Sequence, residues 1–171
     1  MAARLGTTFV LGGARSGKTS HALRLVEAQA ARRVYVATGE AFDAEMTARI
    51  AAHKAERGDG WRTIEAPLDL SGALTSVTAG EAVLVDCLTL WVSNLMHAER
   101  GVEDATDGLL DAMERRAAPL TLVSNEVGLG LVPDTPLGRA FRDAQGRLNQ
   151  RVAAAADHVV FVAAGLPLTL K

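Results

Sequence analysis

Cysteine and aromatic residues are scarce in this chain of 171 residues, and each scarcity excludes some classes of protein. The single cysteine, Cys87, can neither close an intrachain disulfide nor build a cysteine metal cluster, which suits a reducing cytoplasm. Aromatic residues make up 4% of the chain and the formal net charge is -2, so a basic, aromatic nucleic-acid surface is not expected. These features favour small-molecule partners, no nucleic acid and a cytoplasmic location.

Long hydrophobic runs are also missing. The apolar stretches at 82–92 and 159–170 are interrupted by Asp86 in the first and by Gly165 and Pro167 in the second. A membrane-spanning helix needs about 20 consecutive apolar residues, so no membrane span is expected. The N-terminal apolar run is too short for a signal peptide.

Short β-branched runs alternate with longer helical patterns, which predicts a mainly parallel sheet flanked by helices in a single domain covering residues 1–171. Strands are expected at 7–11, 34–38, 62–65, 82–86, 120–124 and 159–163, with a short one near Leu168. Helices are expected at 18–31, 43–57, 88–97, 103–115 and 136–155.

A glycine-rich segment between the first strand and the first helix matches the P-loop pattern. It consists of Gly12, Gly13, Ala14, Arg15, Ser16, Gly17, Lys18 and Thr19. Backbone N–H groups and the helix N-terminus would surround phosphate oxygens, and Lys18 would add a positive charge. The alternative is a tight glycine turn, but the strand and helix on either side favour a nucleotide site.

Two oxygen ligands for Mg²⁺ are expected beside the phosphates. Thr19 supplies a hydroxyl, and Asp86 ends a second apolar strand, where P-loop enzymes carry a metal-binding acid. Asp86 could instead cap the helix that follows it. The P-loop favours the metal role.

Arg49, His53 and Arg57 recur at intervals of four and therefore share one face of the predicted helix 43–57. A neutral imidazole on such a face can attack an α-phosphate and form a phosphoramidate. Spacing alone favours an ordinary solvated face. A regulatory GTPase is disfavoured, because the segment Ser124 to Val127 is not the Asn-Lys-x-Asp sequence that reads guanine.

Seven segments in order resemble one enzyme family, the bifunctional adenosylcobinamide kinases and adenosylcobinamide-phosphate guanylyltransferases of cobalamin biosynthesis. The segments are Gly-Gly-Ala-Arg-Ser-Gly-Lys-Thr (12–19), Tyr-Val-Ala-Thr (35–38), Glu-Met-Thr-Ala-Arg-Ile-Ala-Ala-His-Lys (45–54), Trp-Arg-Thr-Ile-Glu (61–65), Asp-Cys-Leu-Thr-Leu-Trp (86–91), Ser-Asn-Glu-Val-Gly-Leu-Gly-Leu-Val-Pro (124–133) and Phe-Arg-Asp-Ala-Gln-Gly-Arg-Leu-Asn-Gln-Arg (141–151). The resemblance extends from the first strand to Lys171. It implies an α/β fold of the P-loop NTPase, RecA-like kind.

The resemblance implies two reactions. The aminopropanol hydroxyl of adenosylcobinamide is phosphorylated by ATP or GTP, and the adenosylcobinamide phosphate then receives GMP from GTP through a covalent intermediate on His53. The resemblance also implies a homotrimer and a set of nucleotide contacts. Besides the P-loop, with Lys18 as a catalytic charge, these contacts are Ala37, Thr38, Gly39, Lys54, Ala55, Glu56, Arg57, Glu65 and Asp86.

Two positions depart from the family pattern: Thr19 replaces a common serine, and Gly58 stands where proline is usual. Two other functions remain open on the sequence, a P-loop kinase with one activity and a non-catalytic nucleotide switch. The sequence also leaves open the preferred phosphoryl donor, the general base and the corrinoid contacts. Polar residues around the loop 128–136 suit either function or subunit contact; they are Asn125, Glu126, Arg139, Arg142, Asp143, Asn149, Gln150 and Arg151.

Overall fold

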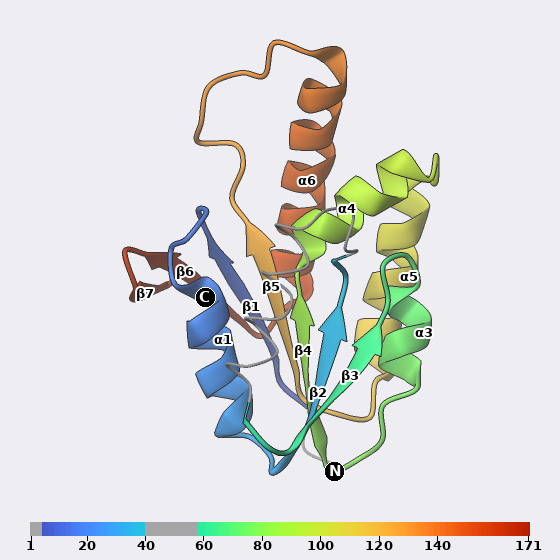
Figure 1. Ribbon diagram of the computed structural model, residues 1–171, viewed down its shortest axis with the longest axis vertical. Helices are drawn as coiled ribbons and strands as arrows, with labels where there is room; N and C mark the ends of the chain where they lie inside the picture. The colour runs from blue at the N-terminus through green and yellow to red at the C-terminus, as the bar shows by residue number, and fades with distance from the viewer. Residues whose placement is uncertain (1–4, 40–57) are drawn as a thin grey trace.

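A seven-stranded sheet forms the centre of the protein in a computed structural model that describes residues 5–39 and 58–171 (Figure 1). The strands are β1 (Thr7–Gly12), β2 (Arg32–Ala37), β3 (Trp61–Glu65), β4 (Glu81–Asp86), β5 (Leu120–Asn125), β6 (His158–Ala163) and β7 (Leu166–Thr169). Their order across the sheet is β3-β2-β4-β5-β1-β6-β7. Strands β1 to β6 run parallel, and only β7 is antiparallel to its neighbour.

Helices cover both faces of this sheet. They are α1 (Lys18–Glu27), α3 (Leu70–Thr75), α4 (Leu88–His97), α5 (Val102–Arg115) and α6 (Pro136–Ala155). Figure 1 shows α1 on one side of the sheet and the other four on the opposite side. Two apolar cores follow from this arrangement: Ala22, Leu23 and Val26 of α1 pack into one core, and the other helices contribute to the larger one.

The inner strands are buried on both faces, which explains their continuous apolar sequence. Phe9 and Val10 of β1 are fully buried although they point to opposite faces, and so are Leu84 and Val85 of β4. The alternative pattern, apolar on one face only, would have left one side of the sheet open to water. The sequence prediction of a mainly parallel sheet between helices is therefore confirmed.

Some predicted helix ends agree with the structure, and others differ from it. Helices α4 and α6 begin and end at the predicted residues. Helix α1 ends at Glu27 rather than at residue 31, because Gln29 N–H bonds to Val26 C=O in a turn. The short helix α3 was not predicted, and the helix predicted at 43–57 lies outside the described residues.

Within the described residues, none of the helices is long and apolar enough to cross a membrane.

Candidate active site

The carboxyl ends of the parallel strands bring several of the predicted site residues to one edge of the sheet. Register pairs Ala37 at the end of β2 with both Glu65 on β3 and Asp86 on β4. It also pairs Gly12 at the end of β1 with Asn125 on β5. In open α/β sheets this edge is where ligands bind, so the fold places the P-loop and Asp86 where a nucleotide site is expected.

The P-loop follows β1 directly and turns sharply into α1. Arg15 has φ 55° and Gly17 has φ 91°, both in the left-handed region, and Ser16 N–H bonds back to Gly13 C=O at 3.3 Å. Gly17 is the N-cap of α1 and provides no side-chain cap, and no acidic residue occupies the first turn. The N–H groups at the start of α1 are therefore not capped by its N-cap residue, an arrangement that suits an anion.

Two glycines of the loop are required by close backbone contacts. A Cβ on Gly12 would lie 2.5 Å from both Ser16 Oγ and Val162 O. A Cβ on Gly17 would lie 3.2 Å from Gly165 Cα, and the Gly165 N–H donates to Ser16 C=O at 2.8 Å. The turn between β6 and β7 thus supports the loop from one side.

Lys18 points back over the loop that precedes it. Its Nζ donates to Gly13 C=O at 2.9 Å, and the residue is only 8% exposed. This holds the ammonium group against the backbone of the cradle, where a phosphate would receive both its charge and the loop N–H groups.

Asp86 ends β4 and accepts a hydrogen bond from Tyr35 Oη to its Oδ2 at 2.9 Å. The N-cap of α4 is Cys87, not Asp86, so the alternative role of Asp86 as a helix cap is excluded. Burial, and then the charge of Asp86, raises the pKa of the Cys87 thiol to about 11. Cys87 is therefore a protonated core residue rather than a nucleophile.

Thr38 is fully buried, and its side chain is hydrogen-bonded to the backbone of Cys87, the residue that follows β4. Its Oγ1 donates to Cys87 C=O at 2.7 Å and accepts from Cys87 N–H at 2.9 Å. Asn94 on α4 donates to Thr38 C=O at 2.7 Å. The Thr38 side chain thus fixes the backbone beside Asp86, whereas Ala37 and Gly39 on either side are partly accessible.

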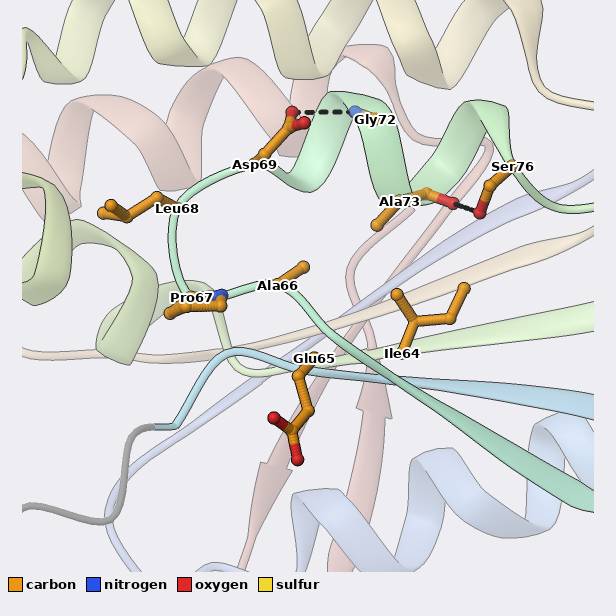
Figure 2. A pocket seen from close by; sticks show the side chains of 9 residues that line it. All are labelled: Ile64, Glu65, Ala66, Pro67, Leu68, Asp69, Gly72, Ala73 and Ser76. Atoms are coloured by element: carbon orange, nitrogen blue, oxygen red, sulfur yellow. Dashed lines mark hydrogen bonds between the residues drawn. The ribbon is translucent and has the colours of Figure 1, made fainter.

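Glu65 is exposed at the end of β3, next to a hollow of about 420 Å³ between this strand end and α3. Figure 2 shows that Ile64 and Ala66 point toward the hollow and that the Glu65 carboxylate points to the other side of the strand. Three strands, β2, β4 and β5, separate β3 from the P-loop strand. The hollow is therefore distinct from the P-loop.

Five predicted site residues lie outside the described part of the chain. These are His53, Lys54, Ala55, Glu56 and Arg57. Their roles remain predictions from the sequence.

The polar residues around the loop after β5 mostly support structure. Arg142 donates to Gly128 C=O at 2.8 Å, and Arg139 donates to the carbonyls of Pro133 and Asp134 at 3.0 Å. Arg151 pairs instead with Glu103 and Asp107 of α5. The two loop arginines hold the loop onto α6, while Arg151 joins two helices.

Tyr35, Asn94 and Thr89 belong to this edge although the sequence analysis did not select them. Tyr35 contacts Asp86, Asn94 contacts Thr38, and Thr89 Oγ1 accepts from Asn125 N–H at 2.8 Å. All three contacts join residues at least 36 positions apart. One signal was present, since Tyr35 and Thr89 lie inside segments that carry the family resemblance.

Comparison with known proteins gives consistent matches along nearly the whole chain. The family model described as cobinamide kinase / cobinamide phosphate guanyltransferase matches residues 8–170. The bifunctional adenosylcobalamin biosynthesis protein CobP of Pseudomonas aeruginosa is 44% identical over 166 residues, covering 95% of this chain and 96% of that protein. The protein CobU of Salmonella typhimurium, with the same descriptive name, is 42% identical and covers 95% of this chain and 98% of its own.

A solved structure supports the fold alone. The protein from Pyrococcus horikoshii OT3 described as a structural study of project PH0250 superimposes with a TM-score of 0.57 at 9% identity, over 98% of this chain and 87% of that one. Identity this low carries no information on activity. The family match and the identity to the curated relatives do carry information on activity, and they confirm the resemblance that the seven segments indicated. The chain belongs to the cobinamide kinase / cobinamide phosphate guanyltransferase family.

Proposed function

We propose that this protein phosphorylates the aminopropanol hydroxyl of adenosylcobinamide with ATP or GTP and then transfers GMP from GTP to the new phosphate, giving adenosylcobinamide-GDP. The observation that carries the proposal is the P-loop cradle, with Lys18 held over Gly13, in a chain of this family. The P-loop accounts for the nucleotide, and the family accounts for the corrinoid acceptor.

In the kinase step, the acceptor hydroxyl oxygen forms a bond to the terminal phosphorus while the bond from that phosphorus to the β-phosphate oxygen breaks. A nucleoside diphosphate leaves, and the hydroxyl proton passes to water. Lys18, the loop N–H groups and the N-terminus of α1 stabilise the negative charge on the phosphoryl oxygens. Little base assistance is needed in a loose transition state, so the catalysis consists mainly of positioning and electrostatic stabilisation.

In the transfer step, a ring nitrogen of His53 attacks the α-phosphorus of GTP and pyrophosphate leaves. A phosphate oxygen of adenosylcobinamide phosphate then attacks the GMP-histidine, and the imidazole is released. His53 must be neutral to attack, because only an unprotonated ring nitrogen carries the lone pair that bonds to phosphorus. The nucleotide contacts proposed for this step are the P-loop, Ala37, Thr38, Gly39, Lys54, Ala55, Glu56, Arg57, Glu65 and Asp86.

Thr19 and Asp86 are proposed to hold Mg²⁺. Both are partly buried at the carboxyl edge and offer a hydroxyl and a carboxylate oxygen, the hard ligands that this ion prefers. When bound, the ion would neutralise charge on the phosphate oxygens. Tyr35 orients the Asp86 carboxylate through its 2.9 Å hydrogen bond.

GTP labelled at the α-phosphate tests the transfer half. Wild-type protein should acquire acid-labile label, and His53→Ala should acquire none while still phosphorylating adenosylcobinamide. Label retained by His53→Ala would assign the intermediate to another residue. Nucleotide binding without any label on the wild type would refute the transfer half.

A cytoplasmic homotrimer is the proposed form of the enzyme. The family resemblance is its main support. The edge strand β7 adds a second, since its Leu166 and Leu168 are 73% and 60% exposed and Leu170, just after it, is 57% exposed. Apolar side chains on an open sheet edge favour burial against another copy.

A further inference from the structure

The turn between β6 and β7 lies beside the P-loop because both follow paired ends of neighbouring strands. Gly12, the last residue of β1, pairs with Val162 on β6. The turn contains only Ala164 and Gly165, since the residues on either side of them pair as strand residues. The pairing of β1 with β6 therefore fixes both where the P-loop starts and where the turn lies.

Both residues of this turn have left-handed backbone angles. Ala164 has φ 50° and Gly165 has φ 79°. Positive φ at both central residues is typical of two-residue turns whose twist matches that of the strands they join. A loop this short between paired strands has little freedom, so the hairpin determines the direction of the Gly165 N–H.

The Gly165 N–H is directed at the backbone of the P-loop. It donates to Ser16 C=O at 2.8 Å, and Ser16 N–H in turn donates to Gly13 C=O at 3.3 Å. Gly17 lies against the same turn, since a Cβ on it would come within 3.2 Å of Gly165 Cα. The turn thus occupies the side of the loop on which Ser16 C=O lies, and a phosphate must approach from another side.

The hydrogen bond to Ser16 C=O also sets the direction of the Gly17 N–H. These two groups belong to one peptide unit, which is planar and trans. The C=O and N–H of a trans peptide point in opposite directions, so a carbonyl directed at Gly165 turns the Gly17 N–H away from the hairpin. This N–H donates to no residue in the ranges 5–39 and 58–171, and it lies at the uncapped start of α1. It is therefore a donor available to an anion.

We infer that Gly165 is a positioning residue for nucleotide binding, because its N–H holds Ser16 C=O outward and so directs the Gly17 N–H at a phosphate oxygen in the P-loop. Without this hydrogen bond the peptide between Ser16 and Gly17 would be free to rotate and to present its carbonyl oxygen to the phosphate. Fixing the peptide beforehand reduces the cost of ordering the loop when nucleotide binds. The inference rests on the proposed function only in requiring that the P-loop binds a nucleotide.

An ester in place of the amide between Ala164 and Gly165 removes this N–H and leaves the side chains unchanged. An α-hydroxy acid at position 165 of the full-length protein introduces it. Calorimetry should show that the affinity for GDP falls about two- to tenfold, the effect of losing one hydrogen bond that keeps the loop in its binding orientation. Affinity for the imido-bridged, non-hydrolysable GTP analogue should fall by the same factor, because both nucleotides carry the phosphates that the loop encloses.

An ester between Thr169 and Leu170 is the matched control. The Leu170 N–H donates to Val159 C=O at 2.8 Å, a bond of the same length in the same hairpin, but Val159 pairs with Phe9 in the middle of β1. Both esters should lower the free energy of unfolding measured in urea, and only the ester at Gly165 should weaken GDP binding. Equal GDP affinities in the two ester proteins, whether both unchanged or both lowered, would overturn the inference.

Gly165→Ala and Gly80→Ala form a second pair that decides the result if an ester protein does not fold. The two glycines have φ 79° and 85°, so alanine strains both backbones, and Gly80 precedes β4 at the opposite edge of the sheet. A Cβ on Gly165 would meet nothing within 4 Å, so the strain there acts on the turn alone. Gly165→Ala should weaken GDP binding about two- to fivefold, and Gly80→Ala should leave it as in the wild type.

Gly165→Asn should restore most of the GDP affinity lost in Gly165→Ala, because asparagine tolerates a positive φ better than alanine does. Unchanged GDP binding in Gly165→Ala would overturn the inference while leaving the proposed function intact. Wild-type protein that binds neither GDP nor the analogue would refute the proposed function itself, and the inference with it.

Discussion

Gly12 and Gly13 are adjacent in the P-loop but differ in the space around them. A Cβ on Gly12 would meet Ser16 Oγ and Val162 O at 2.5 Å, whereas one on Gly13 would meet nothing within 4 Å. Gly12→Ala should therefore lower the free energy of unfolding by about 1–3 kcal/mol, the usual cost of overpacking. Gly13→Ala should change it by less than about 0.5 kcal/mol. Urea denaturation of the two variants measures this difference, and equal stabilities would contradict it.

Lys18 and Lys171 both donate to backbone carbonyls, but only Lys18 does so in the proposed site. Lys18→Met should lower the turnover of both reactions by about 10²–10³-fold, since it removes a preorganised charge from the phosphate. Lys171 donates to the carbonyls of Ala153, Ala154 and Ala156 at the end of α6. Lys171→Met should keep full turnover. Steady-state assays of both half-reactions compare the two, and normal turnover in Lys18→Met would remove it from the mechanism.

At the residue scale, the sequence predicted those site residues that belong to short continuous motifs. The P-loop and Asp86 could be predicted because a strand, a glycine turn and a helix are consecutive in the chain. The contacts of Tyr35 and Asn94 could not, because they depend on strand order and on residues 51 and 56 positions away. Thr38 was predicted to contact the nucleotide, yet its hydroxyl both donates to and accepts from the backbone of Cys87.

At the scale of elements, Arg62 on β3 and Glu81 at the start of β4 form an ion pair across the amino edge, with β2 between the two strands. The hydrogen bonds from Arg62, together with those from Thr78, lower the pKa of Glu81 to about 2 against the opposing effect of burial. The folded pKa lies below the ordinary value of 4.5, so the pair stabilises fully above that value and is lost as pH falls toward 2.

In Glu81→Gln, the free energy of unfolding should therefore fall less steeply than in the wild type as the pH is lowered from about 5 to 2. We expect a difference of about 1–2 kcal/mol over this range, limited by solvent screening at the half-exposed Arg62. Urea midpoints measured across the range test it. Glu103→Gln, which removes the charge from exposed pairs with Arg147 and Arg151, is the control and should leave the slope as in the wild type. Parallel pH curves for wild type and Glu81→Gln would disprove the assignment.

Element bounds followed the sequence where capping and periodicity agreed. Thr135 caps α6 through Gly138 N–H and Pro136 occupies its first turn, so its start was readable. Helix α3 was missed because six residues that include Gly72 give no helical period. It forms because Asp69 caps it and Leu70 and Leu74 enter the core.

At the scale of the whole molecule, the order of the strands determines the site, and the sequence pattern does not reveal that order. Alternating strands and helices predict a parallel sheet but not that β5 lies between β1 and β4. That insertion makes Asn125 a neighbour of the P-loop although 113 residues separate it from Gly12. Asn125 was therefore noted only as one of several polar residues near a loop.

The edge strand β7 provides a test of the proposed trimer. Leu166 and Leu168 are two residues apart and so share one face of the strand, and both are more than half exposed. Leu168→Glu places a charge on that face and should convert trimer to monomer, because burying an unpaired carboxylate costs several kcal/mol. Light scattering coupled to size exclusion measures the mass. Ala117→Glu adds the same charge at an exposed position between α5 and β5 and should leave the trimer intact. A trimer that persists in Leu168→Glu would place the subunit interface away from β7.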